Sequence, residues 1–162
     1  MERDGRRVSP RKFDEFHIFP DVFDAIQKLK TEGYLIVVVS NQPDIARKLM
    51  QTQELDRMSA QLQTLGVDAI RICPHDGSDE CLCRKPKPGL LTSFLDSLVP
   101  SPTEIWMVGD SESDIVAGIA VNARTILLAE SSLSPGSRAE FSRQTLSEAV
   151  ELICHGDPPL GE

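Results

Sequence analysis

The sequence predicts an α/β fold, in which helices cover both faces of a doubly wound, Rossmann-like parallel sheet. Apolar strand-like runs alternate with amphipathic helical stretches along the chain. The clearest run, residues 34–39, is apolar without alternation, which is typical of a strand buried on both faces. The length of 162 residues suits one core, so we expect a single domain over 1–162.

The individual elements follow from apolar periodicity and from the residues that end each element. Residues 22–30 carry one apolar helical stripe, and Gly33 ends this helix before strand 34–39. The other expected elements are helices over 54–65, 90–98, 113–121 and 146–153, and strands over 69–72, 105–108 and 125–128. The serine-rich residues 131–143 are expected to form a loop.

Composition excludes several classes of partner. The formal net charge of −8 argues against nonspecific binding to nucleic acid or to an anionic membrane surface. No apolar run approaches the length of a membrane span, and the N-terminus lacks the apolar core of a signal peptide. We therefore expect a monomer in the cytoplasm. In this compartment clustered cysteines more often bind metal or react than form disulfides.

Three polar clusters follow predicted strands, at the sheet edge where parallel α/β folds bind ligands. They are Ser40-Asn41-Gln42, the segment 109–114, and the loop that starts at Cys73 and delivers Arg84 and Lys85. A lysine and a hydroxyl suit phosphate oxygens, arginine can bind phosphate with two hydrogen bonds, and carboxylates suit Mg²⁺.

Each of these clusters also has an ordinary explanation when it is taken alone. Ser40 could cap a helix, Asp110 could belong to a turn, and Lys85 could be a solvated charge. Their joint placement after successive strands favours a phosphoryl-transfer site instead.

The loop after strand 69–72 contains three of the four cysteines and one histidine. These residues are Cys73, His75, Cys81 and Cys83. Three thiolates and an imidazole are a standard tetrahedral zinc set, and a closed set of four ligands indicates a structural ion. Its role would be to fix Arg84 and Lys85, directly after the last ligand. Reduced or disulfide-linked cysteines remain the alternative at this point.

The order of three motifs resembles the haloacid dehalogenase superfamily of phosphatases. VVVSNQ, CRKPKPG and MVGDSESD are similar to its second, third and fourth motifs, and the resemblance covers roughly residues 13–130. The Cys-Pro-His…Cys-Leu-Cys insertion is similar to the branch of histidinol phosphatases and heptose-bisphosphate phosphatases, which carries a zinc loop at this place.

The resemblance implies a Mg²⁺-dependent phosphatase that works through an aspartyl-phosphate. Ser40 and Lys85 would be catalytic, holding the phosphoryl oxygens, while Asp110 would bind Mg²⁺ and Asp114 would support that site. The implied substrate-binding residues are Asn41, Gln42, Pro43, Arg84 and Ser111. The expected substrate is D-glycero-D-manno-heptose 1,7-bisphosphate. The alternatives are histidinol phosphate or a catalytically silent member of the family.

The family's first motif, Asp-x-Asp-Gly after an apolar strand, has only a partial counterpart here. In one interpretation Glu2 and Asp4 stand in for its two aspartates. In the other, which we favour, the true motif and its strand lie upstream of Met1. Without that central strand, strands 34–39 and 105–108 would keep unpaired edges or be forced together.

The turn after the second motif departs from the family's usual residues. Pro43-Asp44 stands where Ser-Gly is usual, and Lys48 stands where a glycine is usual. Ser40 likewise stands where threonine is commoner. These changes lie near the implied substrate loop.

Overall fold

The structure is a computed structural model that describes residues 2–3, 6–7, 9–129 and 136–156. Its helices are α1 (Val22–Thr31), α2 (Thr52–Thr64), α3 (Gly89–Leu95), α4 (Glu112–Ile119) and α5 (Leu146–His155). Its strands are β1 (Glu2–Arg3), β2 (Arg6–Arg7), β3 (Val37–Asn41), β4 (Ala69–Cys73), β5 (Trp106–Gly109), β6 (Arg124–Leu128) and β7 (Phe141–Arg143). Two short 3₁₀ helices are η1 (Phe13–Glu15) and η2 (Gly77–Asp79).

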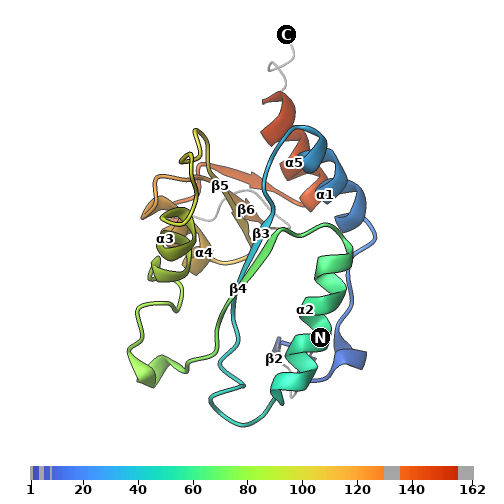
Figure 1. Cartoon of the computed structure of the whole chain (residues 1–162), viewed down its shortest axis with the longest axis vertical. Helices are drawn as coiled ribbons and strands as arrows, with labels where there is room; N and C mark the ends of the chain where they lie inside the picture. Colours follow the sequence, from blue (N-terminus) through green and yellow to red (C-terminus); the bar gives the residue numbers. More distant parts are fainter. Residues whose placement is uncertain (1, 4–5, 8, 130–135, 157–162) are drawn as a thin grey trace.

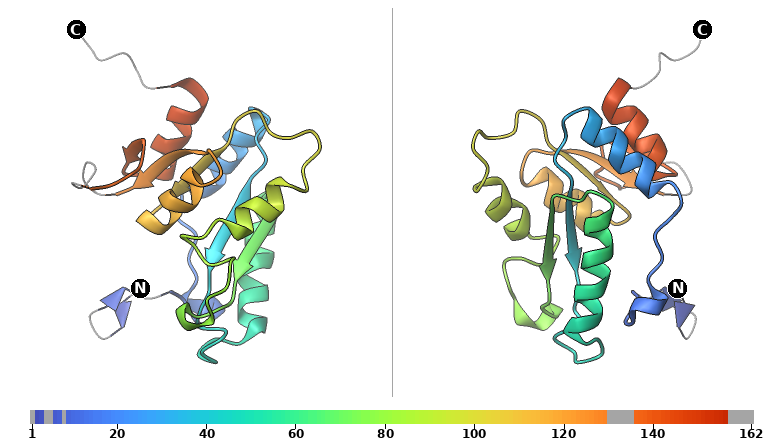
Figure 2. Two further views of the ribbon diagram at one scale, coloured as in Figure 1. Left: turned by 90° about the vertical axis from the view of Figure 1, so that its left-hand side faces the viewer. Right: turned by 45° about the vertical axis from the view of Figure 1, so that its right-hand side comes forward.

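The helices enclose the parallel strands from two sides, which confirms the predicted α/β class. Helices α3 and α4 lie on one side of the strands, and α1, α2 and α5 lie on the other (Figure 1). Helices α1 and α5 lie side by side, far apart as they are in the sequence (Figures 1 and 2). No described helix is both long enough and apolar enough to cross a membrane.

The parallel strands form two separate sheets. Strand β3 pairs with β4, and β5 pairs with β6, which in turn pairs with β7; all three pairings are parallel. Within the described ranges no ladder joins β3 to β5. Of the two arrangements expected for β3 and β5, unpaired edges or a direct pairing, the described residues show the first.

The buried core is centred on β6, the middle strand of the three-stranded sheet. Ile126 is fully buried with Ala149 and Leu152 of α5, and Leu127 is buried with Ile115 of α4. The three valines of β3, residues 37–39, are only half-buried. The apolar side chains of β3 are therefore less buried than those of β6.

Two elements differ from the sequence prediction. Strand β3 starts at Val37 rather than Tyr34, and it includes Ser40 and Asn41, which were expected in the following loop. At its start the Asp68 carboxylate accepts a hydrogen bond from the Ile36 N–H, so a side chain replaces a ladder partner. The expected loop 131–143 ends in β7, which pairs with β6; residues 131–135 lie outside the described part.

The N-terminal residues form a small antiparallel hairpin. Glu2 pairs with Arg7 and Arg3 with Arg6, and β1 and β2 form a two-stranded sheet of their own. The interpretation of a degenerate first motif requires Glu2 to follow a strand of a parallel sheet. Glu2 instead lies in this separate hairpin. Asp4 lies outside the described residues.

Candidate active site

Asn41, at the end of β3, holds the backbone of Lys85. The Asn41 Nδ2 donates to the Lys85 carbonyl, and the Lys85 N–H donates to Asn41 Oδ1, both at 3.1 Å. The two contacts satisfy the whole amide group of a half-buried side chain. Asn41, predicted to bind substrate, thus has a defined second role: it fixes the predicted phosphate-binding lysine to the carboxyl end of β3.

The Lys85 side chain is enclosed, in contrast to a solvated charge. Its ammonium lies 2.5 Å from Asp114 Oδ1 and donates to the Val39 carbonyl at 2.6 Å. The exposed fractions of the two charged side chains are 11% for Lys85 and 7% for Asp114. The contact joins the ends of β3 and β5, because Asp114 belongs to the helix that follows β5.

The turn from β5 into α4 supports Asp114 and places Asp110 beside it in the chain. Asp114 Oδ2 accepts from the Ser111 N–H at 3.2 Å and from Ser111 Oγ at 2.7 Å, which caps the helix. A Cβ on Gly109 would lie 2.4 Å from Asp114 Cβ, so only glycine allows this approach. Asp110 is exposed, and its carboxylate is open to a cation.

The remaining residues predicted from the second motif line the same strand end. Ser40 Oγ accepts from Gln42 Nε2 at 3.0 Å, and both residues are half-buried. Pro43 begins a tight turn in which its carbonyl accepts from the Arg47 N–H. The structure thus joins Asn41, Lys85, Asp114 and Ser111 by direct contacts, while the side chains of Ser40 and Gln42 contact each other.

The cysteine loop brings its four candidate ligands together. The ligand atoms of Cys73, His75, Cys81 and Cys83 all lie within 4.8 Å of one another. Sulfur–sulfur distances run from 3.3 to 3.6 Å, and His75 Nδ1 is 3.2 Å from Cys83 Sγ. Sulfurs bound tetrahedrally at about 2.3 Å from zinc stand about 3.8 Å apart, close to these edges. The thiols are free rather than disulfide-linked.

The thiols in this cluster shift one another's pKa values in opposite directions. Burial raises the pKa of Cys81, but hydrogen bonds from Cys83, Cys73 and nearby backbone outweigh it and lower this pKa to about 7. Burial, together with the neighbouring thiols, raises the pKa of Cys83 to about 12. Ionisation of Cys81 is thus favoured while that of Cys83 is opposed, and a divalent metal would supply the positive charge that further thiolates need.

An ion-pair chain ties the cysteine loop to the turn after β3, and this feature was missed in the sequence. Arg47 donates to both carboxylate oxygens of Asp76, at 2.8 and 2.6 Å, and this guanidinium lowers the Asp76 pKa to about 2. The buried Asp44 accepts from Arg11 Nε at 2.6 Å and lies 3.4 Å from Arg47. The spacing of charges in sequence gives no signal for a contact 29 residues apart.

The Arg84 side chain donates a 3.3 Å hydrogen bond from Nη1 to the His75 carbonyl. Its guanidinium is thereby oriented by the cysteine loop, as the sequence predicted for this position. A Cβ on Gly89 would lie 2.4 Å from the Leu82 carbonyl oxygen, so the glycine allows the loop to close after its last ligand.

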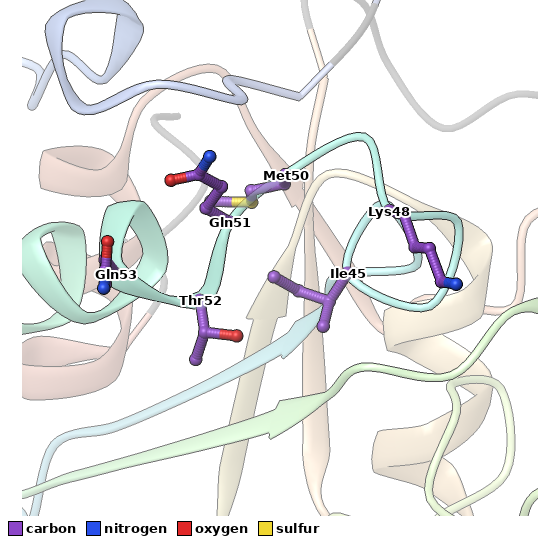
Figure 3. A pocket seen from close by; sticks show the side chains of 6 residues that line it. All are labelled: Ile45, Lys48, Met50, Gln51, Thr52 and Gln53. Atoms are coloured by element: carbon purple, nitrogen blue, oxygen red, sulfur yellow. The ribbon is translucent and has the colours of Figure 1, made fainter.

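A shallow hollow of about 410 Å³ opens beside the turn that follows β3. Ile45 projects toward it from the turn, Lys48 lines its edge, and residues 50–53 bound it where the chain enters α2 (Figure 3). Lys48 has a φ of 58°, in the left-handed region that favours glycine. The hollow adjoins the segment that contains the departures from the family's usual residues.

Comparison with known proteins agrees with this geometry. A D-glycero-beta-D-manno-heptose-1,7-bisphosphate 7-phosphatase from Neisseria meningitidis is 33% identical over 139 residues, covering 79% of this chain and 74% of the relative. The family model described as HAD-hydrolase-like matches residues 82–149. The chain belongs to the HAD-like hydrolase family. Its cysteine loop and its three motifs are the features on which the sequence resemblance rested.

Two further HAD-like relatives bear on the site. A Pseudomonas aeruginosa protein with the same heptose-bisphosphate phosphatase name is 36% identical over 124 residues, covering 73% of this chain and 70% of the relative. A bifunctional histidine biosynthesis protein from Legionella pneumophila is 30% identical over 175 residues, covering 94% of this chain but only 49% of the relative.

The solved structures include a D,D-heptose 1,7-bisphosphate phosphatase from B. bronchiseptica complexed with magnesium and phosphate. It matches with a TM-score of 0.77 and 26% identity, covering 91% of this chain and 89% of that chain. The HAD-like fold predicted from the sequence is therefore confirmed.

Proposed function

We propose that this HAD-like chain binds a small phosphorylated sugar, D-glycero-D-manno-heptose 1,7-bisphosphate, for Mg²⁺-dependent hydrolysis of a phosphate ester. The observation that carries the proposal is the double hydrogen bond by which Asn41 fixes Lys85 to the end of β3, opposite the turn of Asp110. Lys85 would then serve as the cation for phosphate and Asp110 as the carboxylate for Mg²⁺, at the ends of β3 and β5. Curated relatives and a solved structure with heptose-bisphosphate phosphatase names support the choice of sugar.

Each proposed phosphate ligand has a defined task. Lys85 would donate its third ammonium proton to a phosphoryl oxygen, since Asp114 and the Val39 carbonyl take the other two. Ser40 would donate its hydroxyl hydrogen, because its oxygen already accepts from Gln42. Arg84, Asn41, Gln42, Pro43 and Ser111 would shape the surrounding substrate site.

Asp110 fits the requirements of Mg²⁺ as one exposed carboxylate. Mg²⁺ keeps several waters and often binds through one or two carboxylates together with substrate phosphates. Asp114 is engaged with Lys85 and Ser111, so its support for the ion would pass through the turn rather than through direct contact. When bound, Mg²⁺ would neutralise charge on the phosphoryl group.

We further propose that Cys73, His75, Cys81 and Cys83 hold a structural zinc ion. The short distances among their ligand atoms support this assignment, as does the lowered pKa of the Cys81 thiol. Two consequences for the site follow from the contacts of the loop. The loop carries Asp76, which holds Arg47, and it leads directly into Arg84 and Lys85.

Histidinol phosphate is the second candidate substrate, because the histidine biosynthesis relative aligns with 94% of this chain. A catalytically silent member is the third possibility. The sequence contains no Asp-x-Asp pair, and Glu2 lies in a separate hairpin. Turnover by this chain is consequently the decisive measurement.

The test measures phosphate release from heptose 1,7-bisphosphate and from histidinol phosphate, with and without Mg²⁺, alongside calorimetric binding of inorganic phosphate. We expect phosphate binding that Mg²⁺ strengthens and that Asp110→Asn weakens at least tenfold. The matched control Glu112→Gln, a nearby exposed carboxylate, should leave binding unchanged. Phosphate binding that neither Mg²⁺ nor Asp110→Asn affects would contradict the metal assignment.

The same assay separates an active enzyme from a silent relative. Phosphate binding without turnover would identify a silent member. Robust turnover that Glu2→Gln abolishes would instead make Glu2 a working nucleophile, in spite of its position in the hairpin.

A further inference from the structure

Three arginines and two carboxylates gather where the turn after β3 lies against the cysteine loop. The carboxylates are Asp44 of the turn and Asp76 of the loop, and the arginines are Arg11, Arg47 and Arg84. Arg11 donates to Asp44 at 2.6 Å, whereas Arg47 contacts both carboxylates. The proposed function assigns a task to Arg84 but none to the other two arginines.

The turn and the loop are held together by their backbones beyond the end of the β3–β4 ladder. The Gln42 N–H donates to the Cys73 carbonyl at 2.7 Å, and the Ala46 N–H donates to the Pro74 carbonyl at 3.3 Å. These contacts continue the parallel pairing of the two strands. The turn therefore keeps its place beside the loop through contacts that do not involve the Arg47 side chain.

Arg47 occupies the carboxylate of Asp76. Its Nε and Nη2 donate to the two carboxylate oxygens at 2.8 and 2.6 Å, which is the bidentate geometry of a strong arginine–carboxylate pair. The Gly77 N–H donates to Asp76 Oδ1 as well, at 2.6 Å. Both oxygens are thus engaged while Arg47 is in place.

Arg84 lies next to this pair in space. Its Nη1 donates to the carbonyl of His75, the residue directly before Asp76. The hydrogen bond from Arg47 is the largest cause of the low Asp76 pKa, and the charge of Arg84 adds a smaller lowering. Two guanidinium groups therefore act on one carboxylate, and Arg47 is the one paired with it.

Removal of Arg47 would leave the two carboxylates in different situations. Asp44 is buried and would keep its 2.6 Å contact with Arg11. Asp76 would lose its ion-pair partner. A half-buried carboxylate without a counter-ion attracts a nearby cation, and Arg84 is the guanidinium beside it.

We propose that Arg47 is a positioning residue for Arg84: by occupying Asp76, it keeps the Arg84 guanidinium available to a phosphoryl oxygen of the substrate. Without Arg47, Asp76 would pair with Arg84 and compete with the phosphate. The inference rests on the proposed function, which places Arg84 at the substrate site. It gives Arg47 no contact with the substrate. The strength of a partly exposed ion pair corresponds to a loss of phosphate affinity of about fivefold.

The test is a double-variant cycle of the unmodified chain, Arg47→Gln, Asp76→Asn and the two changes together. Calorimetry with inorganic phosphate in the presence of Mg²⁺ gives the affinity of each protein. We expect Arg47→Gln to weaken phosphate binding about fivefold. Asp76→Asn, alone or combined with Arg47→Gln, should remain within about twofold of the unmodified chain, because no carboxylate is left at residue 76 to pair with Arg84.

Lys48→Gln is the charge-matched control. It removes one positive charge from the exposed residue next to Arg47 and should leave the phosphate affinity within about twofold. The zinc content and melting curve of each variant show whether the loop and the fold are kept. Should Arg47→Gln fail to fold, Arg47→Lys takes its place. Lysine is a point charge without the bidentate fork, so a loss of about twofold is expected, again removed by Asp76→Asn.

A second measurement needs neither phosphate nor Mg²⁺. Phenylglyoxal modifies arginine side chains, and mass spectrometry of proteolytic peptides follows Arg84 separately from the other arginines. Arg84 should react at least threefold more slowly in Arg47→Gln than in the unmodified chain, because pairing with Asp76 protects its guanidinium. Adding Asp76→Asn should restore the rate.

An unchanged reaction rate of Arg84 in Arg47→Gln would overturn the inference. Equal losses of phosphate affinity in Asp76→Asn and Arg47→Gln would also overturn it, because the pair would then only hold the loop. An equal loss in Lys48→Gln would overturn it as well, because charge alone would explain the effect. The proposed function fails separately: if the unmodified chain binds no phosphate while the Arg84 rates change as expected, Arg47 controls Arg84 but the phosphate assignment is wrong.

Discussion

The Lys85 ammonium lies 2.5 Å from the Asp114 carboxylate, and both side chains are nearly enclosed. Lys85 belongs to the loop after β4 and Asp114 to α4, so the pair joins the two separate sheets. The sequence analysis assigned Lys85 to the phosphoryl oxygens. The ion pair makes Lys85 a structural residue as well, because its loss leaves a buried carboxylate without a counter-ion.

We therefore expect Lys85→Met to lower the free energy of unfolding by about 3 kcal/mol. Adding Asp114→Asn should recover part of this loss, because the buried negative charge is removed while hydrogen bonds with Ser111 remain possible. Urea denaturation of the two single variants and the double variant gives the coupling energy.

The matched control for this cycle is Lys28→Met. Lys28 also lies 2.5 Å from a carboxylate, Glu151, but this pair is exposed, so its loss should cost less than about 1 kcal/mol. Equal losses for Lys28→Met and Lys85→Met would show that the enclosure of the Lys85 pair has no energetic consequence.

The cysteine loop should carry about one zinc ion per chain, as a four-ligand set requires. Cys81→Ser should lower the zinc content and the melting temperature, since one of the four ligands is lost. Metal analysis of carefully reduced protein is the measurement. Cys154→Ser is the control, because this half-buried thiol on α5 is outside the cluster and its loss should leave the zinc content unchanged. Reduced protein free of zinc would contradict the assignment.

The sequence predicted the parts of the molecule that depend on local periodicity and motif order. Helices α1, α2, α4 and α5 and the four strands β3 to β6 lie where their apolar patterns place them, within a few residues. The cysteine cluster was also predicted, because four candidate metal ligands lie within eleven consecutive residues and a short loop keeps them close together.

The features that the sequence did not reveal depend on long-range contacts. Strand β7 has only three residues and is defined by its pairing with β6, so no periodicity could identify it. The contact between Arg47 and Asp76, and the enclosure of Lys85 by Asp114, likewise arise from the meeting of distant segments.

Alkaline pH should weaken the link between Tyr34 and Glu104. Burial, with the hydrogen bond to Glu104, raises the pKa of Tyr34 from 10.0 to about 12. Because the folded pKa lies above the unfolded one, this stabilising contribution is fully present below pH 10 and is lost as the pH rises toward about 12. Tyr34 is the only tyrosine, so phenolate absorbance during alkaline titration follows it alone.

Two variants check the origin of this effect. Tyr34→Phe should remove this contribution to the loss of stability between pH 10 and pH 12, measured by urea denaturation at each pH. Glu104→Gln should lower the Tyr34 pKa, because the neighbouring negative charge disappears while burial remains. A phenolate transition near pH 10 in the folded protein would show that Tyr34 is not held by Glu104.

Replacement of Lys48 with glycine should stabilise the protein. The Lys48 φ of 58° is unfavourable for a residue with a Cβ, and its side chain is exposed at the edge of the hollow beside α2. Lys48→Gly should raise the free energy of unfolding by about 0.5–1 kcal/mol, because relief of this strain exceeds the extra backbone entropy of glycine in the unfolded chain. Lys48→Ala keeps the Cβ and should give no such gain, which separates backbone strain from the loss of the lysine charge. Urea denaturation of the three proteins measures the difference, and equal stability of the glycine and alanine variants would rule out strain at this position.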